Sequence, residues 1–262
     1  MITFLFSGTS NDFTTPLMPP LRLDPSKRYE VALLSVDMYN SIPNITEENN
    51  ELRYTTDDGD SWKTVKLDKG SYELSSINHE IQRQMIANDD YDKDSTIKFY
   101  LNVTANVSTL KSIVEVTNRR VQVDLGIIGP TLGFTKDAIL RYGYHESPSI
   151  VDIMKINSIL VNIDIISGSY INGSLSPVLY SFYPNVSPGF KIVERPNPSL
   201  IYYPVNRREI DSIRVWLRDQ NNSPIDLRGE RVTVRISLRE VLDLKREIRE
   251  ALALQPVNAG KQ

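Results

Sequence analysis

Near its C-terminus the chain reads Arg231-Val-Thr-Val-Arg-Ile-Ser-Leu238, with an apolar residue at every second position. Ser212-Ile-Arg-Val-Trp-Leu-Arg218 has the same period of two, which is typical of β-strands with one buried face. The segment between them, residues 219–229, is rich in turn formers. We therefore expect the two strands to pair as a wide hairpin.

Strand patterns recur toward the N-terminus, and helical patterns are few. β-favouring runs occupy residues 28–37, 96–103, 112–117, 120–125 and 158–166. Asn118-Arg119 predicts a hairpin between the third and fourth of these runs, and Asp58-Gly59 predicts a tight turn between Tyr54 and Trp62. The fold class predicted from these patterns is mainly β and antiparallel.

Two helices are expected. The first covers residues 71–87, where the spacing of Leu74, Ile77, Ile81 and Met85 forms one apolar stripe. The second runs from about residue 238 to residue 254, with Val241, Leu244, Ile248 and Ala251 on one stripe. Pro256 and Gly260 follow it and end the pattern.

Composition excludes several classes of function. The 262 residues include no cysteine, which excludes disulfides, thiolate catalysis and cysteine zinc sites. The net charge of −3 speaks against a dedicated nucleic-acid binder. No apolar stretch approaches the roughly 20 residues that cross a bilayer, and the apolar start lacks the basic region of a signal peptide. We expect a chain made in the cytoplasm or nucleus.

Motifs for catalysis or cofactor binding are not found. His79 and His145 are interpreted as surface residues, and the acidic groups at Asp57 and Asp90 lack the spacing of a calcium loop. There is no nucleophile elbow, phosphate loop or dinucleotide fingerprint. The sequence thus predicts a protein that is not an enzyme, with no catalytic, cofactor-binding or metal site. The Asn-x-Ser/Thr triplets, such as the one at Asn44, are interpreted as surface-polar sequence.

Aromatic residues gather in a proline-rich region. Such residues either pack loops over the ends of a sheet or form an interface, where tyrosine and arginine supply large contact areas. Prolines at 177, 184, 188, 196, 198 and 204 predict edge strands and long loops here. The residues predicted to form a subunit interface are Tyr180, Phe182, Tyr183, Phe190, Tyr202, Tyr203, Arg207 and Arg208.

Many short motifs resemble one family in their order and spacing. They begin with Tyr29-Glu-Val-Ala-Leu-Leu-Ser-Val-Asp-Met-Tyr-Asn-Ser-Ile-Pro-Asn-Ile45 and Asn49-Asn50, and continue with Lys69–Asn78, Leu132-Gly-Phe134 and Ile156–Ile159. They are densest in Ile166–Gly173, Phe182–Phe190, Tyr203–Asn206 and Asp226–Val234. Together they resemble the minor capsid, or penton, proteins of Polinton (Maverick) elements, which are related to those of virophages and adintoviruses.

The resemblance implies an antiparallel jelly-roll sandwich that forms homopentamers at the fivefold vertices of an icosahedral double-stranded DNA virus-like capsid. It implies a double jelly-roll major capsid protein as partner, with a spike or receptor as a further one, and a location in the virion after assembly in the nucleus or cytoplasm. No specific nucleic acid is implied. The alternative is a jelly-roll receptor- or glycan-binding module that uses the same aromatics.

The domain organisation expected from the sequence has three parts. Residues 1–50 and 135–240 would form the jelly-roll core. Residues 51–134 would be either an inserted α+β lobe or part of the same domain. Residues 241–262 would form the C-terminal helix and a polar tail, which the family pattern does not match.

Overall fold

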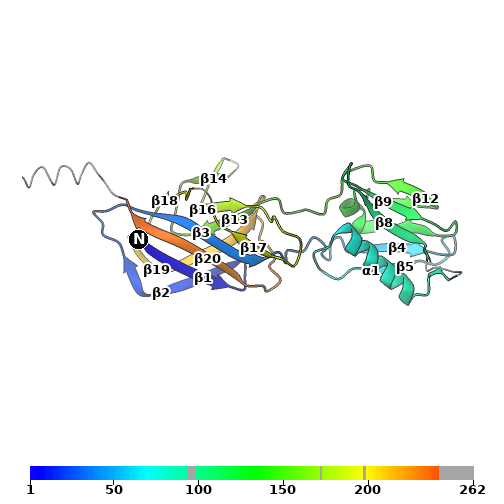
Figure 1. Ribbon diagram of the computed structural model, residues 1–262, viewed down its shortest axis with the longest axis horizontal. Helices are drawn as coiled ribbons and strands as arrows, with labels where there is room; N and C mark the ends of the chain where they lie inside the picture. Colours follow the sequence, from blue (N-terminus) through cyan, green and yellow to red (C-terminus); the bar gives the residue numbers. More distant parts are fainter. Residues whose placement is uncertain (94–97, 172, 197–198, 242–262) are drawn as a thin grey trace, which may run out of the picture.

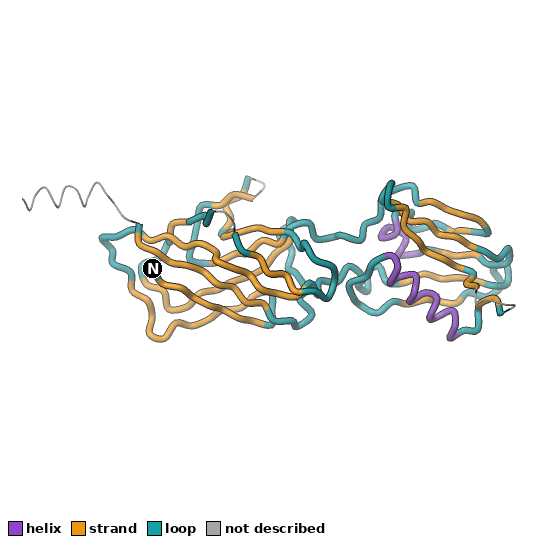
Figure 2. The backbone as a smooth tube through the Cα atoms, in the orientation of Figure 1, coloured by secondary structure: helices purple, strands orange, loops and turns teal. Residues whose placement is uncertain are grey.

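The protein consists of two lobes that lie end to end (Figure 1). The computed structural model describes residues 1–93, 98–171, 173–196 and 199–241. The C-terminal helix expected from about residue 238 does not begin there, because residues 238–240 end a β-strand and Val241 is not helical; residues 242–262 lie outside the described residues. The larger lobe contains both ends of the described chain, and the smaller lobe is built from the middle of the sequence (Figure 2).

The larger lobe is a sandwich of two antiparallel sheets. Its first sheet has the order β1 (Ile2–Gly8), β20 (Val232–Glu240), β3 (Tyr29–Tyr39) and β17 (Lys191–Glu194), with β18 (Tyr203–Pro204) also paired to β3. Its second sheet has the order β16 (Val178–Phe182), β13 (Ile159–Ile163), β19 (Glu209–Asp219) and β2 (Asp12–Arg22). The predicted mainly β, antiparallel fold class is confirmed.

Strand pairing in the sandwich is nested. The first strand pairs with the last, β1 with β20, and the second pairs with the last but one, β2 with β19. Moving inward, β3 pairs with β17, and β13 pairs with β16. An antiparallel ribbon folded on itself in this way, with its strands shared between two sheets, is a jelly roll.

The alternating residues of the last two strands fill the core between the sheets. Val232, Val234, Ile236 and Leu238 of β20 face Ile213, Val215 and Leu217 of β19, and all seven are buried. Each such side chain contributes about 1.5–3 kcal/mol to folding by leaving water. The expected wide hairpin is wrong, however, because β19 and β20 belong to opposite sheets and the turn-rich loop between them crosses from one sheet to the other.

The smaller lobe is inserted between β3 and β13. One of its sheets has the order β11 (Ile139–Leu140), β10 (Gln122–Asp124), β4 (Glu51–Thr55) and β5 (Lys63–Lys66), and another has the order β12 (Gly143–Glu146), β9 (Lys111–Val116) and β8 (Leu101–Asn106). The helix α1 (Leu74–Ala87), the 3-10 helix η1 (Gly126–Leu132) and the short strands β6 (Tyr91–Asp92) and β7 (Lys98–Phe99) complete it.

The insert has its own hydrophobic core. The predicted stripe of α1 is buried as expected, with Leu74, Ile77, Ile81 and Met85 all inside. The core cluster extends from Ile45 to Leu140, and Val151 and Ile153 pack against it. The change from one core to the other therefore falls near residues 44 and 154, whereas the sequence placed it near residues 51 and 134.

Local turn signals in the insert had mixed outcomes. The hairpin expected around Asp58-Gly59 is confirmed, because β4 and β5 pair across it. The turn at its tip, in which the Asp60 N–H donates to the Asp57 carbonyl at 3.4 Å, lies within a longer connection over residues 56–62. The hairpin expected around Asn118-Arg119 is wrong: β9 pairs with β8 and β12, whereas β10 pairs with β4 and β11. The two strands lie in different sheets, as in the larger lobe.

Candidate interaction surfaces

The chain passes between the two lobes twice, and Asn44 joins the two passages (Figure 2). Its side-chain amide donates to the carbonyl oxygens of Tyr72 at 2.7 Å and Ile153 at 3.2 Å, and its side-chain oxygen accepts from the Tyr72 N–H at 2.8 Å. Asn44 is buried, so its interpretation as surface-polar sequence is wrong. We call this junction, residues 40–44 with residues 153–158, the neck.

Contacts across the neck add to this junction. The Ser71 hydroxyl donates to the Ile42 carbonyl, and Lys69 of the insert forms an ion pair with Asp226 of the sandwich loop before β20. The Ser41 hydroxyl donates to the Leu227 carbonyl at 2.8 Å. The insert is therefore attached to the sandwich by side-chain bonds as well as by the two covalent connections.

The ion pair at the neck predicts an acid dependence. A hydrogen bond from Lys69 holds the pKa of the Asp226 carboxyl below its usual value, and the Arg228 N–H assists. A lowered pKa in the folded state means that the pair stabilises the protein above the ordinary carboxylate pKa, and that this stabilisation is lost as the pH falls.

We therefore expect the urea midpoint of the wild type to drop further than that of Lys69→Gln between about pH 7 and about pH 3. Both groups are roughly half exposed, so the difference will be small. An equal drop in the two proteins would contradict a role for this pair.

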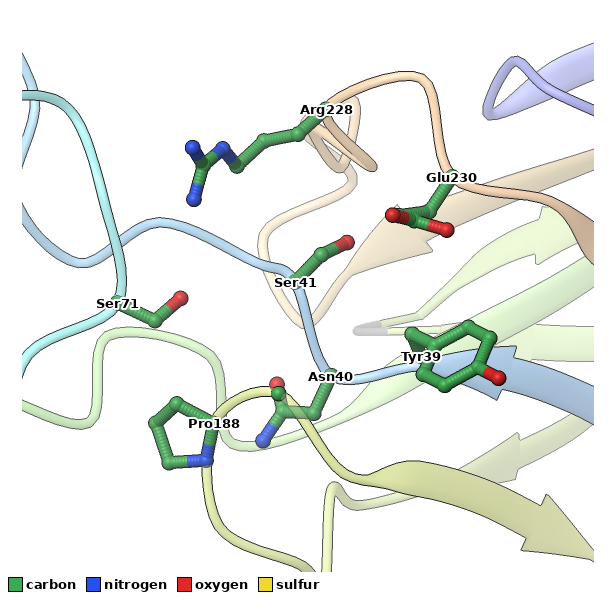
Figure 3. Close-up of a pocket in the computed structure, with 8 residues that line it drawn as sticks. Tyr39, Asn40, Ser41, Ser71, Pro188, Arg228 and Glu230 are labelled. Atoms are coloured by element: carbon green, nitrogen blue, oxygen red, sulfur yellow. The ribbon is translucent and has the colours of Figure 1, made fainter.

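Two concave surfaces adjoin the neck. The larger is an apolar groove of about 560 Å³, lined among others by Ile42, Tyr72, Met154, Tyr183 and Val186. The smaller, about 450 Å³, is polar (Figure 3). Figure 3 shows Arg228 and Glu230 reaching it from the loop before β20, opposite Asn40 and Ser41 from the segment after β3, with Ser71 contributed by the insert.

The eight residues predicted from the sequence to form an interface do not form one patch. Tyr183 and Phe190 are exposed beside the neck, where the Phe190 carbonyl accepts from the Asn40 N–H at 2.9 Å. Tyr202 and Arg208 lie at the other end of the sandwich. There Tyr202 is under the guanidinium of Arg239, and Arg208 donates to the Lys27 carbonyl.

The other four residues have contacts within their own sandwich. Phe182 is only 6% exposed and belongs to the core, so its assignment to an interface is corrected. Tyr180 and Tyr203 pack against the same core, and the Tyr180 hydroxyl donates to Glu194 at 2.9 Å. Arg207 forms an ion pair with Asp164 at 3.0 Å.

Other exposed apolar side chains lie on the two edges of the sandwich. At one edge, formed by β1 and β2, Ile2, Leu5 and Met18 are exposed. At the other edge, Tyr170 and Leu175 are exposed on the hairpin of β14 (Ser169–Ile171) and β15 (Ser174–Ser176), which precedes the edge strand β16. The expectation that the proline-rich region supplies edge strands is confirmed by β16 and β17.

A sequence signal for these edges exists but is subtle. Residues 13–21 and residues 165–190 contain no charged residue, in a chain of which 24% is charged. Such runs are easily taken for core strands. Only the pairing order shows that β2 and β16, which lie in these runs, are edge strands of the sandwich.

The described residues contain no group of three or more histidine, aspartate and glutamate side chains arranged to hold a metal ion. Asp90, interpreted from the sequence as part of a solvated acidic loop, is buried instead. It accepts from the Tyr54 hydroxyl and from Lys63, both at 2.6 Å. Burial, followed by the hydrogen bond to Asp90, raises the pKa of Tyr54.

Within the described residues, no helix has the length and apolar character needed to span a membrane. No protein family matches the sequence, and no curated protein matches it. Among solved structures, the fold is similar to the crystal structure of the mavirus penton protein, with a TM-score of 0.50 and 12% sequence identity. The match covers 92% of this chain and 99% of that chain. At this identity the likeness concerns the fold, which is penton-like.

Proposed function

We propose that this protein is a minor capsid, or penton, protein whose homopentamers occupy the fivefold vertices of an icosahedral double-stranded DNA virus-like capsid. The observation that carries the proposal is the similarity of fold to the mavirus penton protein over nearly the whole of both chains. The similarity spans the insert as well as the sandwich. Jelly rolls in general serve many functions, so a match to the sandwich with its insert supports the proposal more specifically than a match to a jelly roll alone. The sequence motifs support assignment to Polinton (Maverick) elements.

A capsid role requires the subunit to act through its surface. A five-membered ring needs a heterologous interface, in which one patch meets a different patch on the next copy and the rotation closes. A stiff sandwich suits this requirement because its two sheets keep the patches at fixed positions. We further propose a double jelly-roll major capsid protein as the neighbour in the shell, a spike or receptor as an outer partner, and the virion as the location.

The first test is the mass of the purified protein in solution. Native mass spectrometry is expected to give a species of five times the 29.8 kDa protomer mass, and negative-stain images are expected to show fivefold rings. A protein that stays monomeric at all concentrations tested would contradict unaided pentamer formation. A monomer that binds on a glycan array would favour the alternative, a jelly-roll glycan- or receptor-binding module.

The residues proposed from the sequence can be tested in the same measurement. Tyr183→Ala removes an exposed ring beside the neck, and Arg208→Glu reverses a charge at the opposite end of the sandwich. Because the two sites are far apart along the sandwich, each variant reports on its own region. Loss of the pentamer in one variant would locate the contact, and pentamers in both would remove these residues from the proposed interface.

A further inference from the structure

We infer that the two opposite edges of the sandwich are the two halves of one self-association interface. In it, the β1–β2 edge of one copy packs against the β14–β15 edge of the next copy. This inference rests on the proposed function, because it names the surfaces through which the ring would close.

The first edge is apolar and resists strand addition. Met18 on β2 is 91% exposed, and nearby Leu5 and Ile2 on β1 also face solvent. Pro16, Pro19 and Pro20 remove backbone N–H donors from β2, so a neighbouring strand cannot extend the sheet there by a regular ladder. A partner must therefore bind this edge through side chains.

The second edge carries a hairpin with little support of its own. Tyr170 and Leu175 form a cross-strand pair on β14 and β15, and they are 72% and 61% exposed. An isolated two-stranded hairpin is marginally stable in water, because a hairpin needs an apolar face packed on something. The Ser169 hydroxyl anchors its base by donating to the Val178 carbonyl at 2.6 Å. The exposed pair is the face that a partner would cover.

The two edges match in chemistry. Both lie in uncharged runs, residues 13–21 and 165–190, and depletion of charge is the compositional mark of an interface centre. Met18 lies toward the end of the sandwich away from the insert, between Pro16, which pairs with Ser212, and Leu21, which pairs with Ile210, and the hairpin lies alongside the middle of the sandwich (Figure 2).

The occupant of each edge is a second copy of this chain. The edges differ from each other and lie on opposite sides of one rigid sandwich, since β1 and β2 end their sheets on one side and β16 and β17 end them on the other. Contact between unlike patches is heterologous, and it generates a ring when the rotation between neighbouring copies closes. Contact of one edge with the same edge of a second copy would instead generate a twofold dimer. The proline-lined edge does not favour such a dimer.

The absence of cysteine allows a clean crosslinking test. Met18→Cys and Leu175→Cys each introduce a single thiol at an exposed position, so folding should be unaffected. The two variants are co-expressed and treated with a short bismaleimide. Val107→Cys, an equally exposed apolar position in the insert, replaces one partner in the control.

We expect the mixed pair to crosslink about tenfold more than either variant alone or than either paired with Val107→Cys, because assembly raises the effective concentration of the two thiols. The double variant, with both thiols in one chain, should give a covalent ladder that ends at five subunits. Pentamers by native mass without this crosslink, or crosslinks mainly between identical positions, would overturn the inference and leave the proposed function standing. A protein without pentamers would overturn the proposed function and this inference with it.

Discussion

Replacing Gly133 with alanine is expected to lower the free energy of unfolding of the insert by about 4 kcal/mol. Gly133 ends η1 with a φ of +82°, a left-handed conformation that costs other residues about 1–2 kcal/mol. A Cβ at this position would lie 3.0 Å from the Ile150 carbonyl oxygen and closer still to that of Ser149. These are backbone atoms, so overpacking adds about 1–3 kcal/mol.

Gly173 supplies a matched control. Its φ of +81° is nearly the same, but a Cβ there would meet nothing within 4 Å. Gly173→Ala should therefore cost about 1–2 kcal/mol, the conformational part alone. Each lobe contains one tryptophan, Trp62 in the insert and Trp216 in the sandwich, so Trp→Phe backgrounds let urea unfolding be followed in each lobe separately. Equal losses in the two variants would show that the close approach of Ser149 and Ile150 is unimportant.

Asn44→Ala is expected to destabilise the neck by about 3 kcal/mol. The substitution deletes three hydrogen bonds and leaves the Tyr72 N–H and the carbonyls of Tyr72 and Ile153 without these partners. Each of these backbone groups, where it stays buried without a partner, costs about 1–3 kcal/mol. Water molecules that enter the site offset part of this cost. Because Asn44 bonds the outgoing segment at Ile153, trypsin should also cleave after the nearby exposed Lys155 more rapidly in the variant.

Asn50→Ala is the matched control for this prediction. Asn50 is also buried, but its side chain donates a single bond, to the Leu67 carbonyl at 2.9 Å inside the insert. We expect a loss of about 1 kcal/mol there and unchanged cleavage after Lys155. If both variants accelerated this cleavage equally, the effect would reflect general destabilisation rather than a tie at the neck.

The sequence predicted individual elements better than their pairing. The period of two in β19 and β20 and the stripe of α1 arise from residues close together in the chain, and both patterns were confirmed. The pairing errors have one cause. A turn-rich loop after a strand leads equally well into a hairpin or across to the opposite sheet, and local turn chemistry does not distinguish the two.

The interface prediction shows the same limit. Phe182 and Tyr183 are neighbours of similar chemistry, yet one fills the core and the other faces solvent, because β16 ends at Phe182 and Tyr183 begins the loop that follows it. Met18, the most exposed large apolar residue of the described sandwich, was not predicted at all, since a methionine among prolines has no distinctive pattern.

The sequence by itself determined that this protein is mainly β, which residues on several strands face inward, and where the helix of the insert lies. These properties depend on the periodicity of apolar side chains, which can be read from residues close together in the sequence. The tertiary structure decided the nesting of β1 with β20 and β2 with β19, the position of the insert boundaries, and the location of two uncharged runs at opposite edges. These properties depend on contacts between residues far apart in the chain, such as those of β1 with β20, whose free energy comes from burial in a shared core.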